Sequence, residues 1–560
     1  MNMQRSRWYK DAIIYQIYPR SFCDGNADGI GDIRGIISKI DYLKDLGINA
    51  VWLSPVYKSP NDDNGYDISD YRDINPEFGT LDDFKEMLEK MHEAGIKLIM
   101  DFVGNHTSDE HEWFIKGSKD KDSKYHDYYF FKEGKKNGKK PPNNWTSFFA
   151  EGAWNRLDTG EYYLKLFSKK QPDLNWDNPL VRKEMKDILR YWLDLGVDGF
   201  RCDVITIISK EAGLPNSKRI LPILRGGEYY INGPHVHEYI HELNKDVLSN
   251  YDCMTVGESV MITPKEAIEY VKEENEELDM LFSFEHTDVD GWFHIKWFLR
   301  RFNLVRFKKT LTKWQNNLIG NGWGSLYLEN HDQPRSIGRF GTDAKAYPFA
   351  SSTMLATMMY FQYGTPFIYQ GQEIGMRNIS LNLDEYEDIE TANFYKLGRK
   401  LLFTKKYLMK AIHLKSRDNA RTMMQWDNTD NAGFTKGKPW FIVNDNYKQG
   451  INVLEELEDP DSILNYYKKL IALRKGNRIV RDGSYTEYNK KNNKVYCYSR
   501  ILEDKGLLVI ANFKGKDIKY KLPKEFIDKD FEVLISNYDG LNLSKNSILL
   551  KPYQVYVLRF

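Results

Sequence analysis

Short apolar stretches rich in β-branched and aromatic residues recur through the first two-thirds of the chain, and amphipathic stretches separate them. Near-continuous apolar runs of this kind predict parallel strands that are covered on both faces. The stretch 81–95 places its apolar residues at helical spacing and ends in Gly95, as a helix does. Eight strand–helix units favour a closed α/β fold, the (β/α)8 or TIM barrel, over a doubly wound sheet. The runs that we predict to be strands are 12–18, 50–54, 97–103, 197–204, 254–258, 280–284, 325–330 and 366–370.

Two segments interrupt this alternation. Residues 105–174 lack helical periodicity and are too long for a plain loop, so we expect a small inserted domain after the third strand. From residue 480, polar and apolar positions alternate between turn signals, which predicts a C-terminal all-β domain over 480–560, an antiparallel β-sandwich. The barrel then takes residues 1–104 and 175–479.

The charge balance limits the class of partner. The chain has 80 Lys and Arg against 80 Asp and Glu, so its formal net charge is zero. Such a chain has no general attraction for nucleic acid or for an anionic membrane, and we expect a small neutral partner instead. Aromatic residues make up 14% of the chain, enough to supply flat apolar platforms for a carbohydrate as well as core packing.

The four cysteines are widely spaced and form no CxxC pair, so we interpret them as buried apolar residues rather than disulfides or zinc ligands. No apolar run follows the basic N-terminus, and no stretch approaches 18 uninterrupted apolar residues. These features predict a cytoplasmic protein that does not enter a membrane, and we expect a monomer.

Charged residues stand at the ends of several predicted strands. The third strand ends in Asp101, the fourth carries Arg201 and Asp203, the fifth ends in Glu258, and the seventh runs into Asp332. In a parallel barrel, catalytic side chains come from these strand ends. Because an isolated ionised group is costly to bury, several carboxylates at one barrel mouth indicate a catalytic site. Solvated loop acids are the alternative.

Glycoside hydrolysis requires two carboxyl groups that flank a bond, one ionised and one protonated. Arg201 and Asp203 lie on one face of a strand, so we expect Arg201 to lower the pKa of Asp203 and keep it anionic as a nucleophile. Glu258 ends a mostly apolar strand, where desolvation would raise its pKa and suit it as a general acid. A purely structural salt bridge between Arg201 and Asp203 is the alternative.

Five ordered motifs, DFVGNH, QPDLN, GFRCDV, TVGES and ENHD, resemble those of the α-amylase superfamily, glycoside hydrolase family 13, from about Ile14 to the C-terminus. The segments GYDISDY, LFSKKQPDLNW and RTMMQWD resemble its oligo-1,6-glucosidase and α-glucosidase branch. The resemblance implies a (β/α)8 barrel, a domain inserted after strand three and a C-terminal antiparallel β domain. It also implies glycoside hydrolysis with retention and no organic cofactor.

The same resemblance implies roles for single residues. Asp203 would be the nucleophile that forms a β-glucosyl–enzyme intermediate, Glu258 the acid/base, and Asp332 the group that grips the sugar in subsite −1. Asp67 and Arg421 would clasp the non-reducing-end glucose and make the enzyme exo-acting. The other implied pocket residues are Tyr66, His106, Phe167, Gln171, Arg201 and His331.

The residue after the nucleophile bears on the linkage. In this branch it tends to be Val in α-1,6-acting members and smaller or hydroxyl-bearing in α-1,4-acting ones, and here it is Val204. A β-branched side chain would discriminate against an α-1,4-linked acceptor by about 1–3 kcal/mol. The implied function is an oligo-1,6-glucosidase of the isomaltase type. An α-1,4-glucosidase, a trehalose-6-phosphate hydrolase and a sucrose-acting transglucosidase or isomerase stay as alternatives, although 291–310 lacks the RLDRD-like motif of sucrose isomerases.

Two segments carry metal-site patterns. The loop DGNADGIGD (24–32) resembles an EF-hand loop, but Gly35 stands where the twelfth-position Glu would be. The family resemblance implies a structural Ca²⁺ in this loop, and an Asx-rich turn is the alternative. The implied ligands are Asp24, Asn26, Asp28, Ile30 through its carbonyl, and Asp32. The segment HEYIH (237–241) matches a zinc-protease helix but has no evident third ligand.

Overall fold

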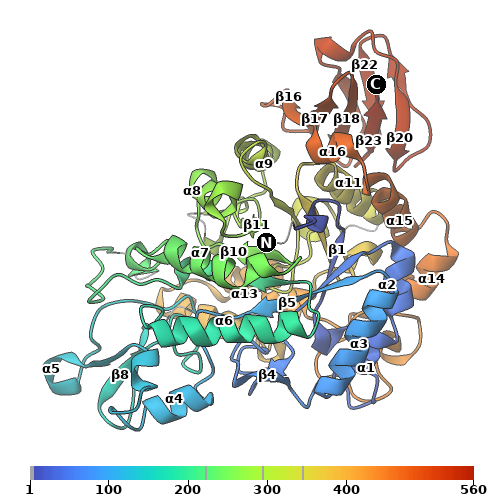
Figure 1. Cartoon of the computed structure of the whole chain (residues 1–560). Coiled ribbons are helices and arrows are strands. Elements are labelled where there is room, and N and C mark those ends of the chain that lie inside the picture. Colours follow the sequence, from blue (N-terminus) through green and yellow to red (C-terminus); the bar gives the residue numbers. More distant parts are fainter. Residues whose placement is uncertain (1–4, 150, 221–223, 293–294, 344–345) are drawn as a thin grey trace.

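A ring of parallel strands forms the centre of the molecule (Figure 1). The structure is a computed structural model that describes residues 5–149, 151–220, 224–292, 295–343 and 346–560. The eight strands follow the order β11-β10-β9-β5-β2-β1-β15-β14, and a parallel bridge from Leu281 to Gly324 joins β11 to β14. The sheet therefore closes, and the predicted (β/α)8 barrel is confirmed. The strands are β1 (Ile14–Ile17), β2 (Ala50–Leu53), β5 (Lys97–Phe102), β9 (Gly199–Cys202), β10 (Met254–Glu258), β11 (Met280–Phe282), β14 (Ser325–Leu326) and β15 (Thr365–Tyr369).

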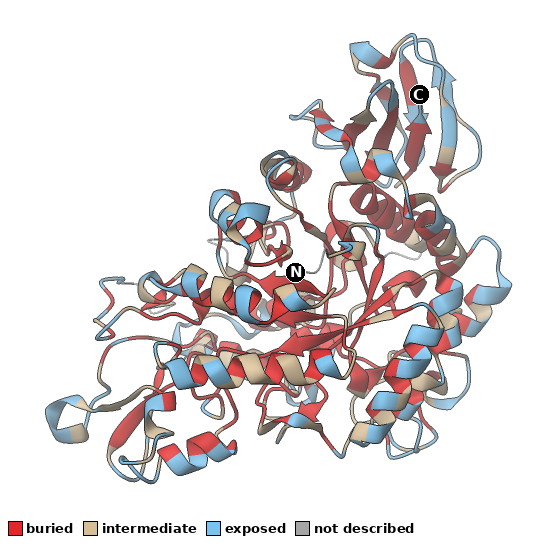
Figure 2. Cartoon of the chain, viewed as in Figure 1, coloured by how far each residue is buried: buried red, intermediate tan, exposed pale blue. Residues whose placement is uncertain are grey.

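Helices surround this ring, and Figure 2 shows buried residues concentrated in the strands and along one side of the helices. Helix α3 starts with a capping box between Thr80 and Asp83 and buries the apolar face that its sequence predicts. Helix α6 starts with Asn178 as its N-cap, followed by Pro179, which suits the first helical position. The main helices are α1 (Ile33–Ile37), α2 (Ile40–Leu46), α3 (Leu81–Glu93), α6 (Pro179–Asp194), α7 (Val236–Asp246), α8 (Pro264–Val271), α9 (Leu304–Leu318), α11 (Pro348–Tyr360), α12 (Ile389–Lys400), α13 (Lys405–Lys415) and α15 (Ile463–Arg474).

The segment between β5 and α6 has a small sheet of its own. Strands β6 (Phe131–Glu133), β8 (Glu161–Leu164) and β7 (Trp154–Arg156) are antiparallel, in the order β6-β8-β7. Bridges from His106 to Asp173 and from Tyr129 to Leu174 hold the start and the end of this segment together. Its exit and return therefore meet at the end of β5, next to the barrel mouth.

Two antiparallel sheets make up the C-terminal part, as predicted. One has the order β16-β17-β18-β23-β20 and the other the order β19-β22-β21. Along β17, Val495 and Cys497 pack toward the second sheet, whereas Tyr496 and Tyr498 join the main core beside the barrel helices. This alternation matches the period of two in the sequence. The bounds are β16 (Ser484–Tyr488), β17 (Val495–Leu502), β18 (Lys505–Asn512), β19 (Ile518–Lys521), β20 (Glu532–Ser536), β21 (Leu543–Ser544), β22 (Ser547–Leu550) and β23 (Val555–Arg559).

The seventh predicted strand is shorter than its apolar run. β14 ends at Leu326, four residues before the predicted end. Beyond it, Glu329 accepts hydrogen bonds from Arg335 at 3.1 Å and from the backbone N–H of Ser336 at 2.6 Å. Buried polar groups are costly unless they are hydrogen-bonded. By leaving the sheet at this point, the chain lets Glu329 bond to Arg335 and Ser336. The hairpin of β12 (Gly291–Trp292) and β13 (Ile295–Leu299) lies where the sequence predicted no element.

All four cysteines are buried and unpaired, which confirms their interpretation as apolar core residues. Across the described ranges, every helix is too short or too polar to cross a membrane.

Candidate active site

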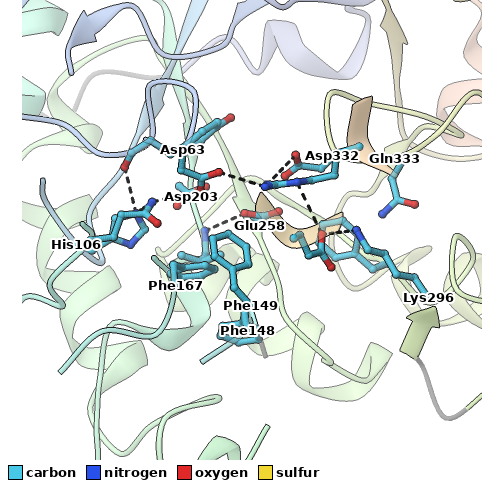
Figure 3. Close-up of a pocket in the computed structure, with 16 residues that line it drawn as sticks. Asp63, His106, Phe148, Phe149, Phe167, Asp203, Glu258, Lys296, Asp332 and Gln333 are labelled. Carbon is cyan, nitrogen blue, oxygen red and sulfur yellow. Dashed lines mark hydrogen bonds and ion pairs between the residues drawn. The ribbon is translucent and has the colours of Figure 1, made fainter. Parts of the chain in front are cut away.

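A pocket of about 240 Å³ opens at the carboxyl ends of the barrel strands, where Figure 3 shows carboxylates and phenylalanine rings around one space. Asp203 directly follows β9, Glu258 ends β10, and Asp332 lies beyond β14. Three strand ends thus bring together the three carboxylates that the sequence singled out. The lining residues are Asp63, Tyr66, His106, Phe148, Phe149, Phe167, Gln171, Asp203, Val204, Glu258, Phe284, Lys296, Asp332, Gln333, Glu390 and Arg417.

One guanidinium group contacts three carboxyl groups at the base of this pocket. Arg201 Nη1 lies 2.5 Å from Asp101 Oδ1 and 2.6 Å from Asp203 Oδ1, and Arg201 Nη2 lies 2.6 Å from Glu258 Oε2. Trp52 Nε1 donates to the second oxygen of Asp101 at 2.8 Å. Arg201 therefore fixes Asp203 relative to Glu258, a role wider than the single pairing predicted from the sequence.

Burial sets the protonation states of the pair. Burial raises the pKa of Asp203 to about 6, although Arg201 acts in the opposite direction. Arg201 thus lowers the pKa of Asp203, as predicted, but the desolvation of the carboxylate is the larger effect, so the net pKa lies above its usual value. Burial also raises the pKa of Glu258 to about 8, in the direction expected from its apolar strand. At neutral pH Asp203 is thus ionised and Glu258 protonated, as a nucleophile and a general acid must be.

Val204 has an unusual backbone conformation. Its φ and ψ are both 36°, in the left-handed region that β-branched residues rarely adopt. Its backbone N–H donates to Glu258 Oε2 at 3.2 Å, and Val204 itself lines the pocket. A conformation of this kind costs about 1–3 kcal/mol and is typical of functional sites. The strained turn links the residue that follows Asp203 to Glu258.

Two arginine side chains contact the carboxylate of Asp332. Arg421 Nη2 lies 2.7 Å from Asp332 Oδ1, and Arg417 Nη1 lies 3.5 Å from the same oxygen. Burial alone would raise the pKa of Asp332, but His331, Arg417 and Arg421 outweigh it and hold this pKa well below its usual range. The ring of His331 stacks against Tyr66, with 5.4 Å between the ring centroids.

Of the predicted contact residues, Tyr66, His106, Phe167, Gln171 and Val204 line the pocket, whereas Arg201 and His331 lie directly behind lining residues. Burial lowers the pKa of His106 to about 4, so this imidazole is neutral. Its Nε2 lies 3.2 Å from the Tyr66 carbonyl oxygen and 3.1 Å from Gln171 Nε2. These contacts join three of the predicted residues into one wall.

Asp67 was predicted to contact the sugar, but it does not line the pocket. It is fully buried outside the lining and accepts backbone N–H groups from Asp62 at 2.9 Å and Asp63 at 3.1 Å. Asp67 therefore shapes the turn, and Asp63 is the carboxylate of this turn that lines the pocket. The sequence NDDNGYD offers three carboxylates within seven residues, and its spacing could not tell which of them faces a ligand.

The arginine that lines the pocket also differs from the predicted one. Arg421 is buried outside the lining, where it contacts Asp332, whereas Arg417 lines the pocket. Arg417 Nη2 lies 3.2 Å from Asp63 Oδ1 and 2.7 Å from Asp388 Oδ1. The paired Asp63 and Arg417 thus occupy the place that the sequence analysis gave to Asp67 and Arg421.

Two residues on the opposite side of the pocket were not predicted individually. Lys296 comes from β13 and Glu390 from α12, and their side chains form an ion pair at 2.5 Å. No motif marks either residue, although the segment 291–303, which contains Lys296, departs from the branch and is the segment expected to shape the leaving-group subsites. The aromatic enrichment was the one available signal for the three unpredicted rings, Phe148, Phe149 and Phe284.

The 24–32 loop turns its side-chain oxygens toward its own backbone. Asp24 accepts N–H groups from Asn26 and Ala27, and Asp28 accepts one from Ile30. Asp32 accepts from Gly35 and so caps α1. This is the Asx-rich turn named as the alternative, and its carboxylate and amide oxygens are also the donors that Ca²⁺ prefers.

The segment HEYIH lies on α7, and its two histidines contact other protein groups. His237 Nδ1 lies 2.9 Å from Glu277 Oε2, and His241 Nδ1 donates to the Asn275 carbonyl at 2.9 Å. Among the described residues, neither histidine belongs to a group of three or more His, Cys, Asp or Glu that could hold a metal ion. The zinc-protease pattern therefore has no support in the structure.

Comparisons with known proteins agree with this fold and site. The α-amylase catalytic domain family matches residues 16–483, and the C-terminal domain family of the α-amylase SusG matches residues 495–557. An oligo-1,6-glucosidase from Parageobacillus thermoglucosidasius is 54% identical over 558 residues, 99% of each chain. A solved trehalose-6-phosphate hydrolase from Bacillus licheniformis is 45% identical with a TM-score of 0.93, covering 99% of each chain. An isomaltulose synthase from Klebsiella sp. LX3 is 42% identical with a TM-score of 0.94, covering 99% of this chain and 100% of that one. With the three carboxylates at the mouth of a closed barrel, these matches show that the chain belongs to the α-amylase family of glycoside hydrolases.

Proposed function

We propose that the protein is a retaining, exo-acting α-glucosidase of the oligo-1,6-glucosidase type, which releases glucose from the non-reducing end of short α-1,6-linked oligosaccharides. The observation that carries this proposal is the pair Asp203 and Glu258, ionised and protonated at neutral pH and bound by one guanidinium. Retaining glycosidases keep their two carboxyl groups about 5–5.5 Å apart. The contacts of both carboxyl groups with Arg201 keep them on one side of the same guanidinium, close to each other.

In the first step, an Asp203 carboxylate oxygen attacks the anomeric carbon while Glu258 gives its proton to the glycosidic oxygen. The carbon–oxygen bond breaks, its electron pair stays on the leaving oxygen, and a β-glucosyl ester forms on Asp203. In the second step, Glu258 takes a proton from water, and the hydroxide oxygen displaces Asp203 from the anomeric carbon. Two inversions return the α configuration.

The ion pair of Asp63 and Arg417 in the pocket lining supports exo action. Asp63 and Arg417 form a buried ion pair in the lining, where their oxygen and nitrogen atoms can bind the hydroxyls of a terminal glucose. Tyr66, His106 and Phe167 supply aromatic rings that can contact the same sugar. Lys296 and Glu390 then lie where polar groups can bind the leaving-group sugar.

Val204 supports the α-1,6 preference, because its side chain lines the pocket beside Asp203 and Glu258. Its backbone is fixed in the left-handed region, so the side chain cannot turn away through backbone relaxation. An α-1,6 linkage adds a methylene between the sugars and tolerates such crowding better than an α-1,4 linkage.

The proposal is tested with purified enzyme on isomaltose, maltose, panose, sucrose and trehalose-6-phosphate. We expect the highest kcat/KM for isomaltose, and a Val204→Ala variant, which removes the β-branched group, whose isomaltose-to-maltose ratio of kcat/KM falls by about 5- to 150-fold, the equivalent of 1–3 kcal/mol. Asp203→Asn is the blank for contaminating activity. A wild type that prefers trehalose-6-phosphate or maltose, or a ratio that Val204→Ala leaves unchanged, refutes the linkage assignment.

The 24–32 loop supports a structural Ca²⁺ in this proposal. Asp24, Asn26, Asp28, Asp32 and the Ile30 carbonyl would hold it, and its charge would stabilise clustered carboxylates. After burial, Asp24 and Asp28 contribute to the raised pKa of Asp32, so a cation in the loop would reduce the repulsion between these carboxylates. The loop lies outside the pocket lining, so the ion would support the fold and take no part in the reaction.

We also infer that the protein works in the cytoplasm as a monomer. The four buried and unpaired cysteines support a reducing compartment. Light scattering after size exclusion tests the monomer, which a mass of twice 65.9 kDa would refute.

A further inference from the structure

One buried carboxylate outside the pocket, Asp290, connects the elements on the leaving-group side. Asp290 stands directly before β12, and its carbonyl accepts the backbone N–H of Arg300 at 2.8 Å, which closes the base of the β12–β13 hairpin. Lys415 Nζ lies 2.5 Å from Asp290 Oδ1. Arg339 donates to both oxygens, from Nη2 to Oδ1 at 2.9 Å and from Nε to Oδ2 at 3.2 Å.

Each partner of Asp290 is connected to a residue or element at the pocket. The hairpin carries Lys296, which lines the pocket. Arg339 Nη1 donates to Gln333 Oε1 at 2.9 Å, and Gln333 also lines the pocket. Lys415 is the last residue of α13, the helix that packs against β13, and the Tyr407 hydroxyl of that helix donates to the Trp297 carbonyl at 3.1 Å.

The cluster is buried and charged. The side chains of Arg339 and Lys415 are 1% and 2% exposed, and that of Asp290 is 11% exposed. Burial would raise the pKa of Asp290, but Arg339 and Lys415 outweigh it and lower this pKa to about 2. Asp290 is therefore ionised at every working pH, and both Arg339 and Lys415 contact it. Burial and the nearby Arg339 lower the pKa of Lys415 to about 7, and Asp290 acts against this and favours its charged form. A buried cation that loses its counter-charge strongly destabilises its surroundings.

None of the three residues lines the pocket, so none of them contacts a sugar. We propose that Asp290, through Arg339 and Lys415, is a positioning residue that holds Gln333 and the Lys296 hairpin in place for the leaving-group sugar. It thereby makes the enzyme selective for oligosaccharides over substrates whose leaving group is not a sugar. The inference rests on the proposed function, since it names how that site recognises the second sugar.

The experiment compares isomaltose with p-nitrophenyl α-D-glucoside, which share the transferred glucose and differ in the leaving group. In Asp290→Asn, which keeps the size and removes the charge, we expect kcat/KM for isomaltose to fall about 10- to 100-fold, mainly through KM. For the aryl glucoside we expect a fall below about 3-fold, because its leaving group needs neither Lys296 nor Gln333.

Glu487→Gln is the matched control, because Glu487 is also a buried carboxylate paired with a buried lysine, Lys308, but lies in the C-terminal sheet far from the pocket lining. It should leave the ratio of the two substrates unchanged. Equal losses on both substrates in Asp290→Asn, or an unchanged ratio, overturn the inference.

If Asp290→Asn does not fold, Lys415→Met and Lys415→Arg decide. Lys415→Met should lower the isomaltose-to-aryl ratio, and Lys415→Arg, which retains a cation, should restore most of it; no difference between the two overturns the inference. A wild type inactive on isomaltose would instead refute the proposed function, and the ratio would then be measured with maltose.

Discussion

At the residue scale, Arg201 contacts more carboxyl groups than its single positive charge can neutralise. Its guanidinium contacts Asp101, Asp203 and Glu258, so three ionised carboxylates would leave the buried cluster with excess negative charge. Burial raises the pKa of Asp101 and Asp203 to about 6 each and that of Glu258 to about 8. The cluster relieves this excess by keeping a proton on Glu258, which is the proton that the proposed mechanism transfers.

The pH dependence of kcat/KM for isomaltose should therefore be bell-shaped. Activity should rise as Asp203 ionises near pH 6 and fall as Glu258 loses its proton near pH 8, with a maximum near 7. Initial rates from pH 4.5 to 9.5 at constant ionic strength measure the two limbs. A profile that stays flat from pH 7 to 9.5 would contradict the assignment of Glu258 as the acid.

A second prediction separates the residues in the lining from those behind it. Asp63→Asn should lower kcat/KM for isomaltose and for p-nitrophenyl α-D-glucoside alike, by about 10- to 150-fold, because charged hydrogen bonds to the shared glucose are worth about 1.5–3 kcal/mol. Steady-state kinetics with both substrates measures this effect. Asp67→Asn should act through the turn and lower the melting temperature as well, and a larger kinetic loss for Asp67→Asn without destabilisation would restore the original assignment.

At the element scale, polar turns decide which side chains reach the pocket. The turn built on Asp67 presents Asp63, and the strained turn at Val204, directly after Asp203, lets the Val204 N–H donate to Glu258. The 24–32 loop leads into α1 through Asp32, whose carboxylate caps the helix. These turns are held by side-chain-to-backbone hydrogen bonds rather than by apolar packing.

Calcium should stabilise the protein without changing its chemistry. We expect the melting temperature to rise with added Ca²⁺ and to fall with EDTA, corresponding to about 2.7 kcal/mol when Ca²⁺ is present at 100 times its Kd. Scanning calorimetry measures the shift. Asp28→Ala should abolish it while kcat is retained, whereas the exposed Asp504→Ala should keep it. If neither Ca²⁺ nor EDTA changes the melting temperature of the wild type, the loop is an Asx-rich turn that binds no Ca²⁺.

The barrel and its strand ends could be predicted because period and burial act locally: apolar runs such as 197–204 become covered strands, and their last residues face the mouth. Asp63 and Arg417 could not be predicted, because the choice among neighbouring polar residues depends on turn geometry. Lys296 and Glu390 reach the pocket from a hairpin and a helix that meet only in the folded chain. The domain boundaries stay a prediction.

At the scale of the whole molecule, the C-terminal sheets are joined to the barrel by buried polar contacts. Lys308 of α9 lies 3.3 Å from Glu487 Oε1 of β16, and Thr312 donates to the other oxygen of Glu487 at 2.7 Å. The Tyr498 hydroxyl of β17 donates to the Met358 carbonyl of α11 at 2.8 Å. Because these groups cannot be solvated in place, the two parts should unfold together.

Lys308→Met should destabilise the protein by about 3–5 kcal/mol, since it leaves Glu487 buried without its counter-charge. The double variant Lys308→Met/Glu487→Gln should recover most of this loss, because the amide still accepts from Thr312. Urea unfolding followed by fluorescence compares them. Equal stability of the single and double variants would show that the pair does not hold the interface.

The proposed binding of the terminal glucose by Asp63 and Arg417 also determines how the enzyme meets a longer chain. A site that holds the chain end cannot slide along a polymer, so each cut is followed by complete release of the shortened chain. The rate then depends on the number of chain ends in solution rather than on the mass of sugar. For a fixed mass, a mixture of short oligosaccharides is consumed faster than one long glucan, and any endo-acting enzyme upstream sets the pace by creating ends.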